Sequence, residues 1–171
     1  MSMINLIAAM DYNRGIGLNN KLPWPKQPAD MEFFRQRTLG QFVLMGRNTY
    51  QGLPQKPLLD RTTIICSRRL QTKMSEPFNK ISDTTWLTHD LDEALLRFSE
   101  YFPNKDLYIV GGQQIYQAAF DANLVERLYI TQIKDVYKYD TSFPSIPLCY
   151  AVHHRHLTSP RLDIIEFHKE D

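Results

Sequence analysis

Cysteine pairs, long apolar runs and clusters of basic residues are all missing from this chain of 171 residues. Its two cysteines, Cys66 and Cys149, form no CxxC motif and stand at no metal-site spacing, which argues against a disulfide scaffold or a zinc site. Cys66 falls inside an apolar run and is expected to be a buried, reduced thiol. This cysteine usage predicts a cytoplasmic protein.

No apolar stretch approaches the roughly 18 residues of a membrane span, and residues 1–10 lack the basic start of a signal peptide. Twenty basic residues against nineteen acidic ones leave a formal charge of +1. Nucleic-acid binders and membrane-surface binders need a concentrated positive surface, which this balance does not provide. We therefore expect neither a nucleic acid nor a membrane as a partner.

The composition that remains is that of an ordinary globular protein, with 43% hydrophobic and 12% aromatic residues. A chain of this length can bury roughly 70% of its unfolded surface. No repeat, linker or low-complexity tract divides it. We expect residues 1–171 to form one domain.

Strand, glycine and helix recur along the chain. Apolar strands are predicted at residues 4–10, 42–45, 62–66, 85–87 and 107–110, helices at 30–39, 91–98 and from 113 to about 120, and a short helical turn from Asn48. This pattern favours an α/β fold with a mostly parallel central sheet and helices on both faces. Residues 128–133, 150–156 and 162–167 are strand-like without helices between them, so antiparallel pairing is expected at one edge.

Residues 11–27 and 70–84 are predicted to be loops. The first is about 17 residues long, more than most connections need, and long ordered loops are commonly functional. It contains Leu22-Pro23-Trp24, followed six residues later by Asp30.

Asp30 lies at the start of the helix predicted at 30–39. At 3.6 residues per turn, Asp30, Met31, Phe34 and Thr38 fall within about 100° of one another, on a mainly apolar face. A carboxylate there is costly unless a ligand with paired N–H donors binds it, although a helix-capping role is an alternative. Desolvation would raise its pKa and the helix N-terminus would lower it, and the sequence does not decide between them.

Three polar segments follow predicted strands and could meet at one edge of the sheet. They are Gly46-Arg47-Asn48-Thr49, Ser67-Arg68-Arg69 and Gly111-Gly112. Glycines at a helix start suit a diphosphate, and arginines recognise a further phosphate with paired hydrogen bonds. Together they fit an adenine dinucleotide that carries an extra phosphate. Taken alone, each segment could instead be a tight turn or a strand end with solvated arginines, without any role in binding a cofactor.

Two other segments give weaker indications of function. The segment from Gly15 to Asn20 lacks the third glycine of a dinucleotide fingerprint, and prolines follow where a helix should begin. His153, His154 and His156 cluster on a predicted strand, with His153 facing opposite to the other two. No acid or cysteine stands at metal spacing from them, so an exposed polar strand face is expected and no metal is predicted.

In their order and spacing, the motifs resemble those of dihydrofolate reductases of the bacterial type over residues 4–167. The resemblance rests on Ile7-Ala8-Ala9, Ile16-Gly17, Leu22-Pro23-Trp24, Pro28-Ala29-Asp30, Phe34, Met45-Gly46-Arg47-Asn48-Thr49, Val110-Gly111-Gly112-Gln113-Gln114-Ile115-Tyr116, Thr131 and Asp140-Thr141-Ser142-Phe143-Pro144.

The resemblance implies reduction of 7,8-dihydrofolate to 5,6,7,8-tetrahydrofolate by hydride transfer from NADPH to C6, with protonation of N5, a step that feeds one-carbon metabolism. It also implies a monomer that binds small-molecule antifolates. Two alternatives are a non-catalytic pterin- or nucleotide-binding protein and a reductase of another heterocycle on the same fold. The acid at Asp30 and the cation at Arg61 favour the first interpretation, because Arg61 suits a substrate with a glutamate tail.

The resemblance also assigns the site. The catalytic set would be Asp30, supported by Thr131, with Trp24 holding a bridging water and Leu22 in the loop that closes over the nicotinamide. Substrate would contact Ile7, Asp30, Met31, Phe34, Leu53, Lys56, Arg61, Val110, Tyr116 and Thr131. NADPH would contact Ala9, Ile16, Gly17, Leu22, Gly46, Arg47, Asn48, Thr49, Ser67, Arg68, Gly111, Gly112, Gln113, Gln114, Ile115 and Tyr116.

The chain departs from the family pattern in several places. Leu22 replaces a methionine of some members, and residues 25–28 contain one extra residue. Gln114 stands where others have an arginine, so Arg47, Arg68 and Arg69 would have to recognise the 2′-phosphate. Tyr139 replaces a glycine of some members in the segment expected to pack on the mobile loop.

Overall fold

The computed structural model describes residues 2–68 and 76–171, so Arg69 and the first part of the predicted 70–84 loop lie outside the described residues. A nine-stranded sheet in the order β10-β11-β8-β1-β7-β3-β4-β6-β5 dominates this part of the chain. Its parallel strands are β1 (Ile4–Met10), β3 (Phe42–Gly46), β4 (Thr62–Cys66), β6 (Thr85–Thr88), β7 (Leu107–Ile109) and β8 (Arg127–Ile133).

Antiparallel strands close both edges of the sheet. At one edge lie β11 (Leu162–Lys169), paired with β8, and β10 (Tyr150–Thr158), paired with β11. At the other edge, β5 (Asn79–Lys80) pairs with β6. The predicted α/β fold with its antiparallel C-terminal edge is therefore confirmed. The prediction of loop at 79–80 is wrong, because a two-residue strand is too short to show a period in sequence and is held by its partner.

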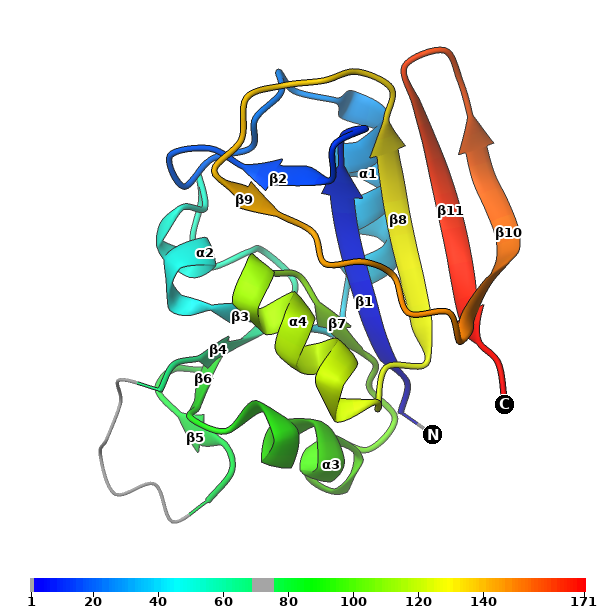
Figure 1. The fold of residues 1–171 in the computed structure, drawn as a ribbon. Coiled ribbons are helices and arrows are strands. Elements are labelled where there is room, and N and C mark those ends of the chain that lie inside the picture. Colours follow the sequence, from blue (N-terminus) through cyan, green and yellow to red (C-terminus); the bar gives the residue numbers. More distant parts are fainter. Residues whose placement is uncertain (1, 69–75) are drawn as a thin grey trace.

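Helices cover both faces of the sheet (Figure 1). Side chains of α3 (Leu91–Tyr101) and α4 (Gln113–Ala122) pack in one apolar cluster with alternate residues of β1, β3, β7 and β8. The opposite face carries α1 (Pro28–Thr38) and the short α2 (Arg47–Gln51). Strands covered on both sides must be apolar throughout, which explains the continuous apolar runs of β1 and β3. None of the helices in the described ranges is long and apolar enough to cross a membrane.

The α1 helix begins at Pro28, two residues before the predicted start at residue 30, and Gly40 follows its end with a φ of +73°. Its buried face differs from the prediction. Met31 is 48% exposed, whereas Phe33 packs against Tyr129, with ring centroids 6.1 Å apart. The covered face is shifted from Met31 toward Phe33 because α1 lies over two neighbouring apolar clusters, and Phe33 contacts both.

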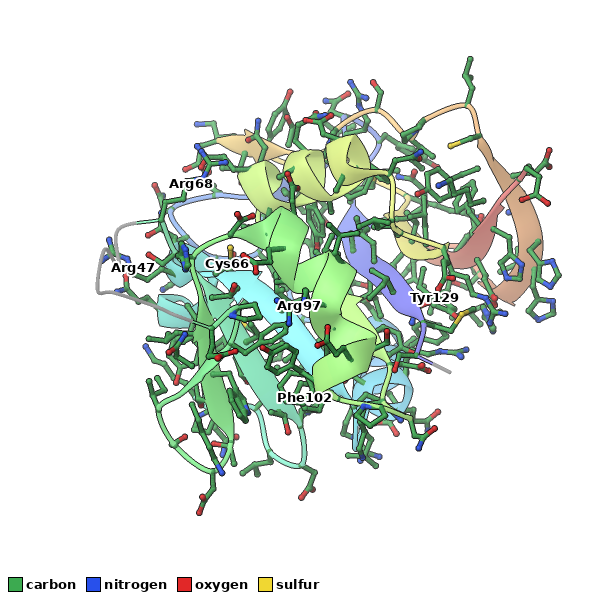
Figure 2. The ribbon with its side chains drawn as sticks, turned by 90° about the horizontal axis from the view of Figure 1, so that it is seen from below. Arg47, Cys66, Arg68, Arg97, Phe102 and Tyr129 are labelled. Carbon is green, nitrogen blue, oxygen red and sulfur yellow. The ribbon has the colours of Figure 1, made fainter. Side chains whose placement is uncertain are left out.

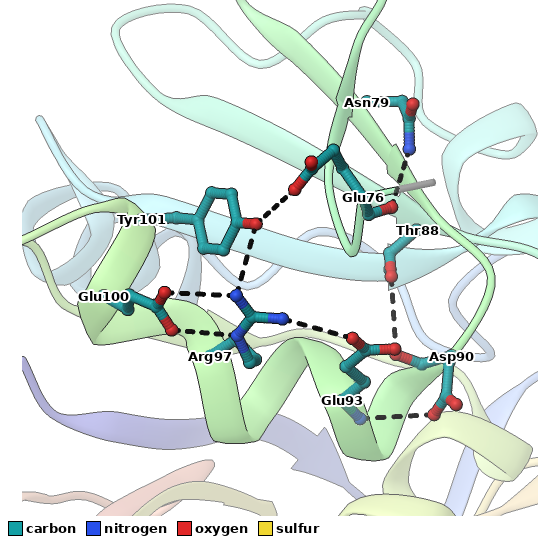
Figure 3. A network of polar contacts seen from close by, with 8 residues as sticks. All are labelled: Glu76, Asn79, Thr88, Asp90, Glu93, Arg97, Glu100 and Tyr101. Atoms are coloured by element: carbon teal, nitrogen blue, oxygen red, sulfur yellow. Dashed lines mark hydrogen bonds and ion pairs between the residues drawn. The ribbon is translucent and has the colours of Figure 1, made fainter. Parts of the chain in front are cut away.

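The α3 helix is held by its cap and by a surface network (Figure 3). The Asp90 carboxylate accepts a hydrogen bond from the backbone N–H of Glu93, as the spacing of Asp90 and Glu93 in the sequence predicts for a helix N-cap. The Glu93 carboxylate bonds the Arg97 guanidinium, which also bonds Glu100 and Tyr101. Such a cap is worth about 1 kcal/mol, while exposed ion pairs contribute little each.

Two short strands, β2 (Gly15–Gly17) and β9 (Thr141–Ser142), form a separate antiparallel pair. They lie at the end of the large sheet where β1 finishes (Figure 1). The predicted 11–27 loop is thus partly a strand. Its pairing partner lies more than 120 residues later in the chain, so no local pattern could have revealed it.

The histidine-bearing strand β10 is only partly the exposed face expected. His153 and His154 are exposed, but His156 packs on Phe33 and its Nε2 lies 2.7 Å from the carboxylate of Glu166. Glu166 is buried and also contacts Nε2 of His168 at 2.6 Å. Burial alone would raise the pKa of Glu166, but the two histidine hydrogen bonds outweigh it and lower that pKa. The acid partner was invisible in sequence because it comes from the neighbouring strand.

Candidate active site

Asp30 sits in the first turn of α1 and reaches the middle strands of the sheet. The hydroxyl of Thr131 on β8 donates to Asp30 Oδ1 at 2.6 Å. Thr131 is buried and is the cross-strand neighbour of Ala9 on β1. Asp30 and Thr131 are therefore in contact, as the family resemblance implies, although 101 positions separate them in the chain.

Burial raises the pKa of Asp30, and the hydrogen bond from Thr131 offsets only part of that rise. The competition left open by the sequence is thus decided in favour of desolvation. A carboxyl whose pKa is raised by burial is typical of a functional site.

An apolar floor lies beside this carboxyl. Buried Ile7 of β1 packs in one cluster with the partly buried residues Phe34, Leu53 and Val110. Tyr116 of α4 joins from the other face, donating its hydroxyl to the Ile7 carbonyl at 2.8 Å. Burial raises the pKa of Tyr116, and the nearby charge of Asp30 raises it further, so Tyr116 is a neutral donor near the same carboxyl.

A cavity of about 320 Å³ continues from α1 toward the segment after α2. It is lined by Arg35, Leu39, Gln55, Leu58, Leu59, Asp60 and Arg61. Arg61 is oriented by bonds from Nε to the Leu59 carbonyl at 2.8 Å and from one terminal nitrogen to Thr38 Oγ1 at 3.3 Å. Lys56 does not line this cavity, and its ammonium donates to the Gln51 carbonyl.

Sequence reasoning found Arg61 but missed Arg35, Leu39, Gln55 and Leu58 in this cavity. Arg35 on α1 and Leu39 at its C-cap lie one turn apart, but at 3.6 residues per turn both fall on the side of the helix away from Asp30, so helical spacing from Asp30 does not select them. The loop residues offered no periodic signal either. Their place depends on how the segment between α2 and β4 folds back on the helix.

Two glycine segments meet where β3 and β7 end. The backbone N–H of Gly46 donates to the carbonyl of Gly111 at 2.9 Å. Gly111 has a φ of +122°, and a Cβ there would stand 3.4 Å from the Tyr116 hydroxyl. At Gly112 a Cβ would meet Thr49 Oγ1 at 3.3 Å, and at Gly46 it would meet Ile115 at 3.3 Å. The glycines therefore keep the backbone open at the start of α4.

The next strand along this edge brings in Ser67 and Arg68. Gly46 pairs with Cys66 across β3 and β4, and Ser67 follows buried. Burial raises the pKa of the Cys66 thiol to about 11, although the nearby charge of Arg68 lowers it. The expectation of a buried thiol is confirmed, and the raised pKa makes this thiol unreactive. Figure 2 shows Arg47 and Arg68 at the same margin of the molecule as Cys66. Both arginines are exposed.

The long loop crosses this region from β9 to α2. Asn19 and Asn20 have φ values of 52° and 62° and form a two-residue turn closed by paired backbone hydrogen bonds between Leu18 and Lys21. A Cβ at Gly52, just after α2, would stand 2.6 Å from the Asn20 carbonyl oxygen, so the turn rests directly on that glycine. Leu22 remains 58% exposed, while Trp24 is buried beside Tyr137.

Asp11 anchors the base of this loop. Sequence reasoning did not select Asp11, because only its place after a strand distinguished it. It is fully buried. Its Oδ1 accepts the backbone N–H groups of Asn13 and Gly15, and its Oδ2 accepts that of Tyr137, each at 2.9 Å. One carboxylate thereby ties both ends of the loop's first turn to the segment after β8.

Replacing Asp11 with alanine is expected to lower the free energy of unfolding by about 2–4 kcal/mol, because three backbone N–H groups, that of Gly15 buried and the other two partly buried, lose a charged acceptor. Chemical denaturation would measure this. Asp135→Ala is the matched control, since the Asp135 carboxylate accepts only a local bond from the Val136 N–H. Equal losses in both variants would contradict the anchoring role of Asp11.

A carboxyl with a pKa raised by burial, together with a glycine-lined strand edge that carries arginines, is compatible with an α/β oxidoreductase that binds a heterocycle and a phosphate-bearing cofactor. The family model described as dihydrofolate reductase matches residues 3–159. The dihydrofolate reductase of Mus musculus is 35% identical over 157 residues, covering 85% of this chain and 80% of its own length. The enzyme of Lactococcus lactis is 36% identical over 143 residues, covering 84% and 79%.

The chain belongs to the dihydrofolate reductase family. Its activity is the NADPH-dependent reduction of dihydrofolate, which places it in tetrahydrofolate and one-carbon metabolism. Relatives from vertebrates, from Drosophila melanogaster and from a bacterium match about equally well, so the narrower bacterial type expected from sequence has only loose support.

Proposed function

We propose that Asp30 is the group that binds and orients the pterin ring of dihydrofolate. Two carboxylate oxygens can accept the 2-amino and N3 hydrogens in a paired arrangement, which fixes orientation as well as binding. The observation that carries this proposal is the Asp30 carboxyl itself, held by Thr131 at 2.6 Å with its pKa raised by burial. The pterin then lies on Ile7, Phe34, Leu53 and Val110.

The proton for N5 comes from water in this proposal, with Asp30 favouring the protonated ring through its charge. Trp24 supports it, because its indole Nε1 is buried and has no hydrogen-bond partner among the described residues. An N–H in that position can orient a water molecule between Trp24 and the pterin. Thr131 keeps the Asp30 carboxylate in place during this step.

The glutamate tail of the substrate occupies the cavity lined by Arg61. The Arg61 guanidinium is held by Leu59 and Thr38, so one face of its planar fork is already fixed for a carboxylate. The aminobenzoyl ring lies between Phe34 and the leucines of the cavity. Met31, half-exposed at the rim, covers the ring from α1.

The residues at the glycine-lined edge fit NADPH. Gly111 and Gly112 leave room that a Cβ would fill, and no side chain among the described residues caps the start of α4, so its first N–H groups suit a diphosphate. Gln113, Gln114, Ile115 and Thr49 border the diphosphate beside Arg47 and Asn48, and Ser67 and Arg68 meet the 2′-phosphate. NADPH supplies the hydride when it is bound.

Near the nicotinamide, the chain contributes Ala9, Ile16, Gly17, Gly46 and Tyr116. The loop that carries Ile16, Gly17 and Leu22 excludes water from the reacting atoms. We further propose a cytoplasmic monomer, and that diaminopyrimidine antifolates bind Asp30 through the same donor pair as the pterin.

The test is NADPH consumption with and without dihydrofolate, with NADH alongside. Oxidation that depends on dihydrofolate and is faster with NADPH supports the proposal. Oxidation with another heterocycle but not with dihydrofolate would indicate a different substrate. NADPH binding without any turnover would indicate a silent binding protein.

Replacing Arg68 with glutamine is expected to raise KM for NADPH about tenfold while leaving KM for NADH unchanged, because only NADPH carries the 2′-phosphate and a charge-assisted hydrogen bond is worth roughly that factor. Steady-state kinetics with both cofactors measures this. Arg161→Gln, in the exposed turn between β10 and β11, is the control. An equal change for both cofactors would move the 2′-phosphate site away from Arg68.

A further inference from the structure

Gln113 adds a polar link between α4 and β9, beside the packing of Phe143 on Tyr116 and Phe120 of α4. It is the first residue of α4, directly after Gly112, and its side-chain Oε1 accepts the backbone N–H of Ser142 on β9 at 3.2 Å. Because a backbone N–H can only donate, the amide oxygen faces β9 and the Nε2 group is directed away from Ser142.

The strand that Gln113 holds also holds the loop. In the β2–β9 pair, Gly15 lies opposite Ser142 and Gly17 opposite Thr141. The Asp140 N–H donates to the Gly17 carbonyl at 2.8 Å, and the Asn19 N–H donates to Asp140 Oδ2 at 2.9 Å. We therefore expect a displacement of β9 to displace residues 15–19 of the loop.

Glycine is needed for this contact on the loop side. A Cβ at Gly15 would stand 2.9 Å from Tyr139, and one at Gly17 would collide with the Thr141 hydroxyl. The side chains of Tyr139 and Thr141 thus pack directly against the backbone of these two glycines. We expect this close packing to transmit a change at Ser142 to residues 15–19.

We propose that Gln113 is a positioning residue that couples cofactor binding at the start of α4 to placement of the 15–19 segment. The proposal rests on the assignment of the diphosphate to that helix start. A diphosphate bound to the first N–H groups of α4 holds its first turn still, so Gln113 presents a fixed acceptor to β9. Coupling is reciprocal: whatever cofactor binding adds to loop placement, loop placement adds to cofactor affinity.

The alternative is an ordinary surface hydrogen bond, since Gln113 is exposed. Such a bond would affect protein stability in the same way with and without cofactor. A coupling role instead changes how strongly NADPH protects the loop. The distinguishing quantity is therefore the difference in amide exchange between the free and the NADPH-bound protein.

The experiment measures hydrogen exchange at the Asn19, Asp140 and Phe143 amides, with and without saturating NADPH, in Gln113→Met. Methionine is similar in size but lacks the acceptor. In the unaltered protein NADPH should slow exchange at these amides. In Gln113→Met that slowing should shrink roughly threefold to tenfold, the factor a neutral hydrogen bond supplies, and reciprocity requires the NADPH Kd to rise by the same factor.

Two further variants sharpen the result. Gln117→Met is the matched control, because Gln117 lies one turn later on α4 and bonds only Asp121 there, and it should behave as the unaltered protein. Gln113→Glu keeps an acceptor for Ser142 and should restore the slowing at saturating NADPH. Unchanged slowing in Gln113→Met, or no restoration by Gln113→Glu, would overturn the coupling.

The coupling and the proposed function fail in different ways. If the unaltered protein does not bind NADPH, the cofactor assignment is wrong and the coupling falls with it. If it binds NADPH and reduces dihydrofolate but shows no NADPH-dependent slowing at these amides, only the coupling is wrong.

Discussion

Replacing Asp30 with asparagine is expected to lower turnover of dihydrofolate at least a hundredfold, while NADPH affinity stays within about twofold. Loss of one preorganised electrostatic contact in an active site typically costs a factor of 10² to 10³. Asparagine keeps an oxygen that can accept from Thr131, but its Nδ2 group replaces the second carboxylate oxygen, so the charge and one acceptor for the pterin are lost together. Steady-state turnover and NADPH titration by fluorescence measure the two quantities.

The same variant lowers turnover but is expected to raise the stability of the fold at neutral pH. The folded pKa of Asp30 is raised above its ordinary value of 3.8, so the folded state favours the protonated form. The stability this contributes is present at pH values below the unfolded pKa and is lost as the pH rises through the folded one. Asp30→Asn is therefore expected to melt at a higher temperature than the unaltered protein at pH 7, with the difference vanishing near pH 3.

Asp121→Asn is the control for both measurements, because Asp121 is exposed on α4 and contacts only Gln117. It should leave turnover and melting temperature unchanged. Turnover that survives in Asp30→Asn would refute the role of the carboxylate. A lower melting temperature at pH 7 would show that the charge stabilises the fold, contrary to its burial.

Replacing Gly111 with alanine is expected to lower the free energy of unfolding by about 2–3 kcal/mol and to abolish measurable NADPH binding. An L-residue with a φ of +122° is strained, at a cost of roughly 1–3 kcal/mol. The added methyl would also touch the Tyr116 hydroxyl, which bonds the Ile7 carbonyl. Denaturation curves and NADPH titration would record both effects.

Gly40→Ala separates backbone strain from the effect on the site. Gly40 also has a positive φ, +73°, but nothing lies within 4 Å of where its Cβ would be. It should cost about 1 kcal/mol and leave NADPH binding intact. If Gly111→Ala loses no more stability than Gly40→Ala and still binds NADPH, Gly111 does not shape the cofactor site.

The fold was largely predictable because its main strands are covered on both faces. β1 and β4 begin and end where their apolar runs do, and the strand-to-helix junctions carry glycine. The exposed Met31 and the partly buried Phe33 were not predictable. One helical period is compatible with several rotations of α1, and only packing over two apolar clusters selects one of them.

The candidate site divides in the same way. Asp30 was recognisable in the sequence because a carboxylate on an apolar helix face is costly unless a ligand binds it. The glycines at 46 and 111–112 were recognisable because they lie between a predicted strand and a helix, where glycine lets a ligand approach the backbone. The direction of the Asp30 pKa shift was not predictable. It depends on how much of the carboxyl is buried and on the single hydroxyl of Thr131, which arrives from 101 residues away.

By itself, the amino-acid sequence determined the parallel α/β sheet, the antiparallel edge and the residues that gather at the strand ends. Each of these follows from the local hydrophobic pattern and from the rule that parallel strands end at one edge of the sheet. Only the tertiary structure decided the β2–β9 pair, the anchoring of the loop by Asp11, the Arg61 cavity and the link from Gln113 to Ser142. These features consist of a few hydrogen bonds between distant short segments, and segments of two or three residues carry no periodic signal from which a partner can be predicted.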